Sequence, residues 1–195
     1  MPRHLVLALV AALAVCHLAS AYGSDVTMEL RVFNGGDEVT PQTRLAVHRA
    51  GERGDTGLNA SSADGRARVQ VPQGIYDVQA IHERDGKVVN IRWANRLVVM
   101  PYPDEPGLHL EVINFKAGFG ALQVRDQDNS HPDVAIYEPS KHDKPAAPAH
   151  NGSVYALFVV PAGTYDLQIR SGGRVRWQNG LEVPLDRTRL WVVGR

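Results

Sequence analysis

The side chains best suited to chemistry are gathered in one irregular segment, Asp126 to Ser153. Imidazole and carboxylate groups bind zinc or copper, and the candidate metal ligands here are His131, His142, Asp143 and His150. A functional metal site needs ligands held in a preformed geometry, whereas the prolines of this segment predict an extended polar loop. We therefore expect no metal and no other cofactor. A metal-dependent enzyme that uses this loop is the alternative interpretation.

Trp93 and Trp177 are the second kind of candidate, because an indole can stack on a sugar or peptide ring. Each follows an aliphatic residue by two positions, Ile91 or Val175, so a strand would place both on one face. We expect that face to be the core, where a tryptophan buries a large area and needs one partner for its N–H group. A ligand-binding platform is the alternative for both residues.

The chain contains an internal repeat that must position these residues. Residues 45–77 align without a gap on residues 134–166, and residues 92–99 align on residues 176–183 after a shorter hairpin. Apolar positions fall on apolar positions, and the two tryptophans recur at the same relative place. No acid, base or ligand set is evident in both copies.

The best-defined part of each copy is a Val-Pro-x-Gly-x-Tyr-Asp stretch, at residues 71–77 and 160–166. Proline presets φ early in a turn, and a glycine two residues later can take the left-handed conformation. Both stretches therefore predict the turn of a β-hairpin. Tyr76 and Tyr165 are expected to point inward, as the tyrosine corner of other sandwiches does.

Period-two alternation dominates after the first twenty-odd residues, and no stretch shows a helical period with caps. The alternating segments predict seven short strands in each copy, which is the pattern of a β-sandwich. We therefore expect an all-β protein with two tandem seven-stranded β-sandwich domains of prealbumin-like or Ig-like type. Their bounds are residues 22–116 and 117–195. The junction near residues 116–118 is short, so the two domains are expected to pack against each other.

A family resemblance rests on residues 63–78, where Asp64-Gly65 precedes one strand and Pro72-Gln73-Gly74-Ile75-Tyr76 opens the next. This pattern resembles the carboxypeptidase-regulatory-like domains of the transthyretin-like (prealbumin-like) sandwiches. The second copy matches it in part, since it has Asn151-Gly152 in a shifted position. The resemblance implies a fold and no activity. The tail of the transthyretin-like hydrolases and the paired tyrosines and histidines of the related iron dioxygenases have no counterpart here.

Residues 1–21 predict a secretory signal peptide, with a short polar start, an apolar run of residues 5–15 and a small-x-small cleavage signal that ends at Ala21. The run is too short to span a membrane. Val15 is poorly suited to a lipobox, so no lipid anchor on Cys16 is expected. We predict a secreted or periplasmic protein that has lost its only cysteine.

The formal net charge of the chain is zero, and nucleic acid or an anionic membrane as main partner would need clustered Lys and Arg. We therefore expect no nucleic-acid partner. Because turns and cores explain most repeated positions, the favoured function is a non-catalytic exported module. It would bind a protein or a carbohydrate partner in the cell envelope or outside the cell.

Overall fold

The structure is a computed structural model, and it describes residues 25–54, 57–63, 65–101 and 107–194. The expected signal peptide and Cys16 lie outside these residues. An N-terminal half comprises β1 (Val26–Asn34), β2 (Asp37–Glu38), β3 (Thr43–Arg49), β4 (Leu58–Asn59), β5 (Ser61–Ala63), β6 (Arg66–Val71), β7 (Gly74–Arg84), β8 (Lys87–Val99) and β9 (Leu108–Asn114). A C-terminal half comprises β10 (Phe119–Asp126), β11 (Asp133–Tyr137), β12 (Tyr155–Pro161), β13 (Gly163–Ser171), β14 (Arg174–Val183) and β15 (Thr188–Val193).

The protein is all-β, as predicted, apart from a 3-10 turn at Thr40–Gln42 among the described residues. Within the same residues, no helix has the length and apolar character that a membrane crossing requires.

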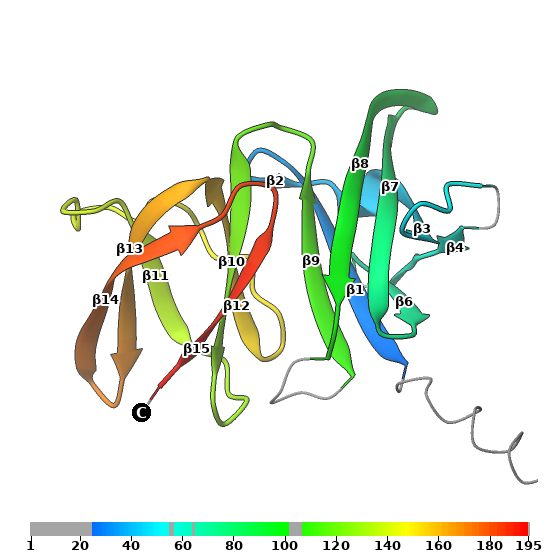
Figure 1. Ribbon diagram of the computed structural model, residues 1–195. Coiled ribbons are helices and arrows are strands. Elements are labelled where there is room, and N and C mark those ends of the chain that lie inside the picture. Colours follow the sequence, from blue (N-terminus) through cyan, green and yellow to red (C-terminus); the bar gives the residue numbers. More distant parts are fainter. Residues whose placement is uncertain (1–24, 55–56, 64, 102–106, 195) are drawn as a thin grey trace, which may run out of the picture.

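Each half is a sandwich of two sheets, and the four sheets lie side by side as layers (Figure 1). In the N-terminal half, the sheet of β1, β2, β5, β6 and β9 packs against the sheet β4-β3-β7-β8. In the C-terminal half, β12-β10-β15 packs against β11-β13-β14. One cluster of buried aliphatic and aromatic side chains fills the space inside each sandwich. Burial of apolar area of this kind is the main stabilising contribution to such a fold.

The repeat is visible in the strand pairing as well as in the sequence. β1 runs antiparallel to β6 and parallel to β9, and β10 runs antiparallel to β12 and parallel to β15. β7 lies between β3 and β8 just as β13 lies between β11 and β14. The two halves therefore share one topology, to which the N-terminal half adds the short strands β2, β4 and β5.

The prediction of seven strands in each copy is not met, because two expected strands are continuous in each half. β8 spans residues 87–99 and β14 spans residues 174–183. A bulge replaces the expected turn in both, and the residue at the bulge has a positive φ: 55° at Arg96 and 73° at Gly180. A bulge inserts one residue and bends the strand without ending the ladder.

The Pro-x-Gly stretches are corners between sheets, and the hairpin prediction for them is wrong. β6 and β7 belong to different sheets of one sandwich, as do β12 and β13. Gly74 and Gly163 are not in the left-handed region. A side chain at Gly74 would instead meet the Tyr76 ring at 3.4 Å. The Tyr76 hydroxyl donates to the Pro72 carbonyl at 2.7 Å across the corner.

The second corner has the same hydrogen bond, from the Tyr165 hydroxyl to the Pro161 carbonyl at 2.8 Å. Both tyrosines are buried, which confirms the prediction that they point inward. Each corner is thus fixed by the tyrosine that follows it.

The two halves pack against each other through the sheets that contain β1 and β10. A third apolar cluster joins them, with Phe33 and Leu110 on one side and Ala121, Tyr155, Leu157 and Val159 on the other. Because this cluster covers their outer faces, β1, β10 and β12 are buried on both faces along most of their length. Some of the polar groups buried there are paired across the junction.

Glu29 shows this pairing. Its side chain is 2 % exposed, and its carboxylate accepts a hydrogen bond from the Tyr155 hydroxyl at 2.6 Å. Arg68 donates to the same carboxylate at 2.9 Å from Nη2. Next to it, Arg31 Nη1 donates to the carbonyl of His150 at 2.9 Å. A buried charge needs such partners, because an unpaired one is very costly.

Candidate functional site

The candidate metal ligands of the 126–153 segment lie in different places. His150 packs edge-on against Phe33 with ring centroids 4.8 Å apart, and burial is the main cause that lowers its pKa. His131 lies beside β13 at the other end of the half, and Asp143 is exposed. Among the residues that the structure describes, no group of three His, Cys, Asp or Glu side chains is arranged to hold a metal ion.

His142 belongs instead to a cluster on the outer face of the β11–β13–β14 sheet, which we call the C-terminal aromatic cluster. Its ring stacks on Trp177 with centroids 4.0 Å apart and planes 15° apart. The Tyr137 ring contacts the same indole edge-on at 5.2 Å. His142 Nε2 lies 2.8 Å from Asp166 Oδ2, and the Gly180 amide donates to Asp166 Oδ1 at 3.0 Å.

The N-terminal half carries a similar group on the outer face of its β3–β7–β8 strands, the N-terminal aromatic cluster. The Arg53 guanidinium lies over Trp93, 4.7 Å from the ring centroid, which is a cation–π contact. The His48 ring lies 5.5 Å from the same indole. Arg53 Nε donates to Asp77 Oδ2 at 3.2 Å, and the Arg96 amide donates to Asp77 Oδ1 at 2.8 Å.

The two clusters have the same arrangement of equivalent residues. Each has an acid that binds the amide of the bulge residue, an indole on the neighbouring strand, and a cationic or imidazole side chain that contacts both. The equivalent pairs are Asp77 and Asp166, Trp93 and Trp177, His48 and Tyr137, and Arg96 and Gly180. The repeat therefore does contain a duplicated polar set, contrary to the expectation from sequence. Arg53 and His142 occupy equivalent positions of the gapless alignment, as His48 and Tyr137 do, but both pairs differ in residue type, so the alignment does not reveal the set.

The prediction that the tryptophans lie in the core is wrong. Trp177 is 37 % exposed, Trp93 is half-buried, and neither belongs to an apolar core cluster. Ile91 and Val175, on the same faces, are more exposed still. Only one face of each sheet is covered by its partner sheet, and the tryptophans stand on the other. The alternative, an exposed platform, is the one that this position permits.

Neighbouring groups lower the pKa of the acid in each cluster. The contact with His142 is the largest of the causes that lower the pKa of Asp166, with the amides of Gly180 and Ser140 adding to it. In the N-terminal cluster, the Arg96 amide is the main cause that lowers the pKa of Asp77. Both carboxylates are therefore held ionised, and each anchors a loop side chain over its indole.

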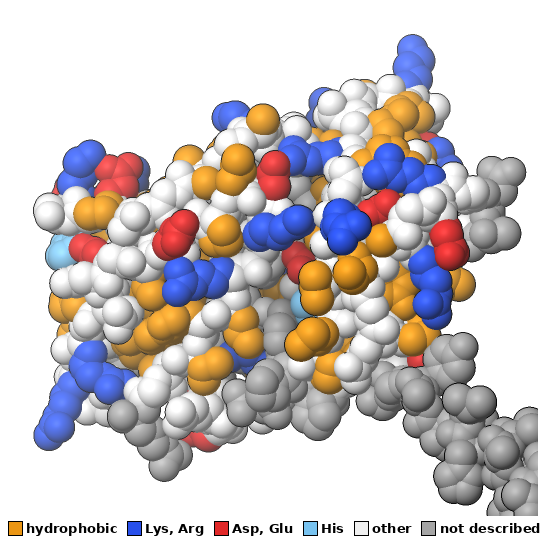
Figure 2. Space-filling model, viewed as in Figure 1, with side chains coloured by type: hydrophobic (Ala, Val, Ile, Leu, Met, Phe, Trp, Pro, Cys, Tyr) orange, Lys and Arg blue, Asp and Glu red, His pale blue; other side chains and the backbone are white. Residues whose placement is uncertain are grey.

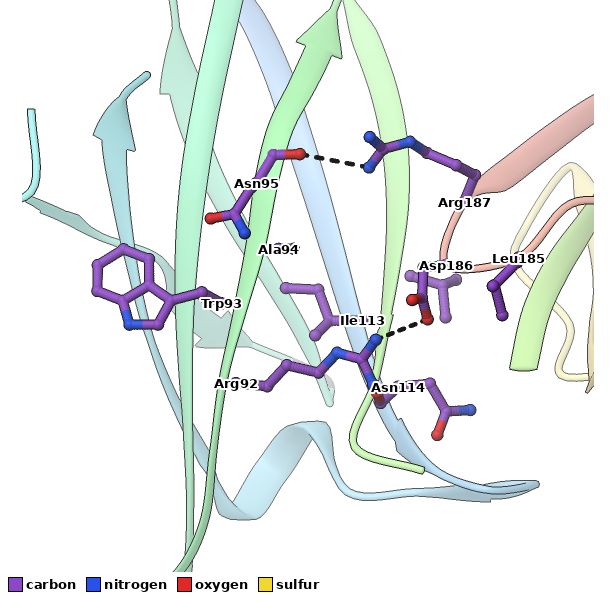
Figure 3. Close-up of a pocket in the computed structure, with 10 residues that line it drawn as sticks. Arg92, Trp93, Ala94, Asn95, Ile113, Asn114, Leu185, Asp186 and Arg187 are labelled. Carbon is purple, nitrogen blue, oxygen red and sulfur yellow. Dashed lines mark hydrogen bonds and ion pairs between the residues drawn. The ribbon is translucent and has the colours of Figure 1, made fainter. Parts of the chain in front are cut away.

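A cleft of about 280 Å³ lies where the two halves meet, beside the N-terminal aromatic cluster (Figure 3). One wall is formed by β8 and β9, with Arg92, Asn95 and Val112. The other is the loop between β14 and β15, with Asp186 and Arg187. Figure 3 shows the indole of Trp93 pointing away from the residues that meet across the cleft.

Hydrogen bonds across the cleft hold its walls together. Arg92 Nη2 donates to Asp186 Oδ1 at 2.6 Å across the cleft, and within its own wall Arg92 Nη1 donates to the carbonyl of Asn114. The Val112 amide donates to Thr188 Oγ1 at 2.8 Å. The cleft is thus built jointly by the two halves and is polar, with two arginines and one carboxylate.

No protein-family model matches the chain, and no curated protein matches its sequence. Solved structures do resemble it. The TIE protein of Bacillus anthracis is 18% identical, with a TM-score of 0.35 over 87% of this chain and 34% of that one. The minor pilin of Streptococcus agalactiae is 11% identical, with a TM-score of 0.27 over 86% of this chain and 94% of that one. The chain thus spans about a third of the Bacillus anthracis protein.

The surface charge is mixed on the face shown in Figure 2. Lys and Arg side chains are spread among acidic and hydrophobic ones there, and they do not form one continuous basic area. The formal net charge of zero agrees with this pattern. That face offers no continuous track for a phosphate backbone, which proteins bind with clustered Lys and Arg.

Proposed function

We propose that this protein is an exported, non-catalytic β-sandwich module that binds a protein or glycan partner in the cell envelope or outside the cell. The single observation that carries the proposal is the aromatic cluster repeated on two outward sheet faces. An indole on an outward sheet face, held by an acid and a loop side chain, gives a fixed surface for a sugar or peptide ring, and tryptophan is enriched among residues that dominate binding.

The proposal includes two tandem domains, residues 22–116 and 117–195, of the carboxypeptidase-regulatory-like or transthyretin-like type. The shared pairing scheme of the two halves and the repeated Pro-x-Gly-x-Tyr corner support it. It also includes cleavage after Ala21, so that the mature N-terminus is Tyr22. Mass spectrometry of protein from its native envelope checks this, and a lipid-modified Cys16 would contradict it.

The experiment for binding compares three variants, Trp93→Ala, Trp177→Ala and Val175→Ala, with the wild type. Val175 is the control, because it is exposed on the same face as Trp177 outside the cluster. Glycan-array binding and crosslinking in the native envelope supply the partner. We expect the two tryptophan variants to bind the partner more weakly than the wild type, and the valine variant to bind it as the wild type does. All three variants should remain folded. Unchanged partner binding by both tryptophan variants would contradict the proposal.

A further inference from the structure

We infer that the cleft between the two halves is a binding site for an acidic sugar, a uronate or a similar carboxylate-bearing ring. This inference rests on the proposed function as far as glycan binding is concerned, but it concerns a different surface from the two aromatic clusters. Binding sites commonly lie where two domains meet, because both can contribute groups there.

The cleft holds one more positive charge than negative. Arg92 is paired with Asp186 at 2.6 Å. Arg187 has a single long contact, 3.4 Å to the carbonyl of Asn95, and no carboxylate within ion-pair distance among the described residues. Its guanidinium can therefore receive an anion, and a planar guanidinium suits a carboxylate because two parallel N–H groups match two oxygens.

The remaining polar groups of the cleft suit hydroxyls. Asn95 Oδ1 accepts a hydrogen bond from Arg53 Nη2 at 2.5 Å, which fixes the orientation of the amide. Asn95 Nδ2 then has no acceptor among the described residues, and it can donate to a ligand. Asp186 uses Oδ1 for Arg92, while its side chain is 46% exposed and Oδ2 can accept. Of two neighbouring sugar hydroxyls, one can accept a hydrogen bond from Asn95 Nδ2 while the other donates to Asp186 Oδ2.

The size and the apolar lining also fit one sugar ring. About 280 Å³ holds a single ring, whereas Ala94, Val112 and Leu185 give apolar area for its C–H groups. The walls are already ordered by the hydrogen bonds that join the halves, so binding needs little rearrangement. A small, preformed and mostly polar cleft is a site for a small polar ligand rather than for a large apolar one.

The repeat explains why the site occurs once. Asn179 is the equivalent of Asn95, and Arg176 is the equivalent of Arg92. Arg176 donates to the Gly194 carbonyl at 3.2 Å, and among the described residues it has no ion pair with a loop of the other half. The cleft therefore depends on the loop with Asp186 and Arg187, which the C-terminal half supplies to the N-terminal half.

The test is a nuclear magnetic resonance titration of the full chain with sodium D-glucuronate, with D-glucose and sodium acetate as reference ligands. We expect glucuronate to shift the Asn95 side-chain amide and neighbouring signals, and to bind about tenfold or more tightly than either reference, since a charge-assisted hydrogen bond adds to the hydroxyl contacts. Equal binding of glucose would show that the carboxylate is not recognised. Equal binding of acetate would show that the sugar ring is not recognised. Either result overturns the inference.

Matched variants locate the site. Arg187→Ala and Asn95→Ala should each weaken glucuronate binding about tenfold or more. Arg174→Ala removes the same charge from an exposed position outside the cleft, and Asn179→Ala changes the equivalent asparagine of the other half, so both should bind as the wild type does. Uniform weakening by all four would show that the effect is not specific to the cleft and would overturn the inference. If the tryptophan variants lose glycan binding while Arg187→Ala and Asn95→Ala bind glucuronate as the wild type does, the proposed function stands and the cleft assignment fails.

Discussion

Arg92 of the N-terminal half forms an ion pair with Asp186 of the C-terminal half at 2.6 Å, whereas its repeat equivalent Arg176 donates to the Gly194 carbonyl of its own half. The same position in the repeat thus performs two tasks. In the first copy the arginine joins the two halves, and in the second it makes an exposed hydrogen bond within its own half. The junction, with its buried Glu29 and Tyr155, is the part of the fold that a single copy would lack.

Unfolding is expected to be cooperative across the junction. Leu157 is fully buried there, in the cluster that joins the halves, so Leu157→Ala should lower the free energy of unfolding by about 2 to 5 kcal/mol. We expect one calorimetric transition in the wild type and in the variant, since each half loses a buried face when the other unfolds. Two separated transitions in the wild type would show that the halves unfold independently.

Stability should decrease at alkaline pH because of Tyr155. Burial, with the nearby Glu29 carboxylate, raises the pKa of Tyr155 to about 12, against about 10 in an unfolded chain. The fold therefore favours the neutral phenol. Its contribution is complete below about pH 10 and is lost as the pH rises towards 12, by about 3 kcal/mol in all.

Urea unfolding of the wild type and of Tyr155→Phe between pH 8 and pH 12 measures this contribution. The variant should start about 1 to 3 kcal/mol less stable, because Glu29 loses a buried hydrogen-bond partner. Its stability should then fall less steeply with pH. Parallel slopes for the two proteins would contradict a role for Tyr155.

Trp177 should contribute modestly to stability. Since its indole is exposed outside the core, Trp177→Ala should cost less than Phe158→Ala, a core truncation expected to cost about 3 to 5 kcal/mol. Thermal unfolding of the two variants provides the comparison. An equal loss of stability in the two variants would contradict this expectation and favour the core role that the sequence pattern predicts for Trp177.

His142 should control the ionisation of Asp166 and leave that of Asp77 unchanged. Removing the imidazole by His142→Ala takes away the main cause of the lowered pKa, so the pKa of Asp166 should rise towards its ordinary value. Asp77 is held by the Arg96 amide and serves as the internal control. Carboxyl-carbon chemical shifts followed from pH 7 to pH 2 report both groups. An unchanged Asp166 titration would show that the backbone amides alone lower its pKa.

Protein purified without chelator should contain no stoichiometric metal. His131, His142 and His150 have separate surroundings, and His142 already contacts Asp166 at 2.8 Å. Elemental analysis, followed by titration with zinc, copper and iron, measures any bound metal. Tight metal that is lost in His142→Ala and in His150→Ala would favour the metal-dependent enzyme over the binding module.

The sequence by itself determined the all-β class, the repeat and the burial of Tyr76 and Tyr165. These follow from local rules, because alternation and turn residues act over a few positions. It misplaced the Pro-x-Gly corners, since a turn signal does not say whether the next strand returns to the same sheet or crosses to the other. It also split β8 and β14, because a bulge and a turn use similar residues.

Only the tertiary structure decided which face of each strand is covered. Alternation assigns Trp93 and Trp177 to a face, but the partner sheet decides whether that face is core, and here it covers the opposite one. The aromatic clusters and the cleft also depend on residues from loops and from the other half, such as Arg53, His142 and Arg187. Arg53 and His142 occupy equivalent positions of the repeat, but alternation does not apply to loops and so does not place their side chains over the indoles. Arg187 reaches the cleft only because the two halves pack against each other.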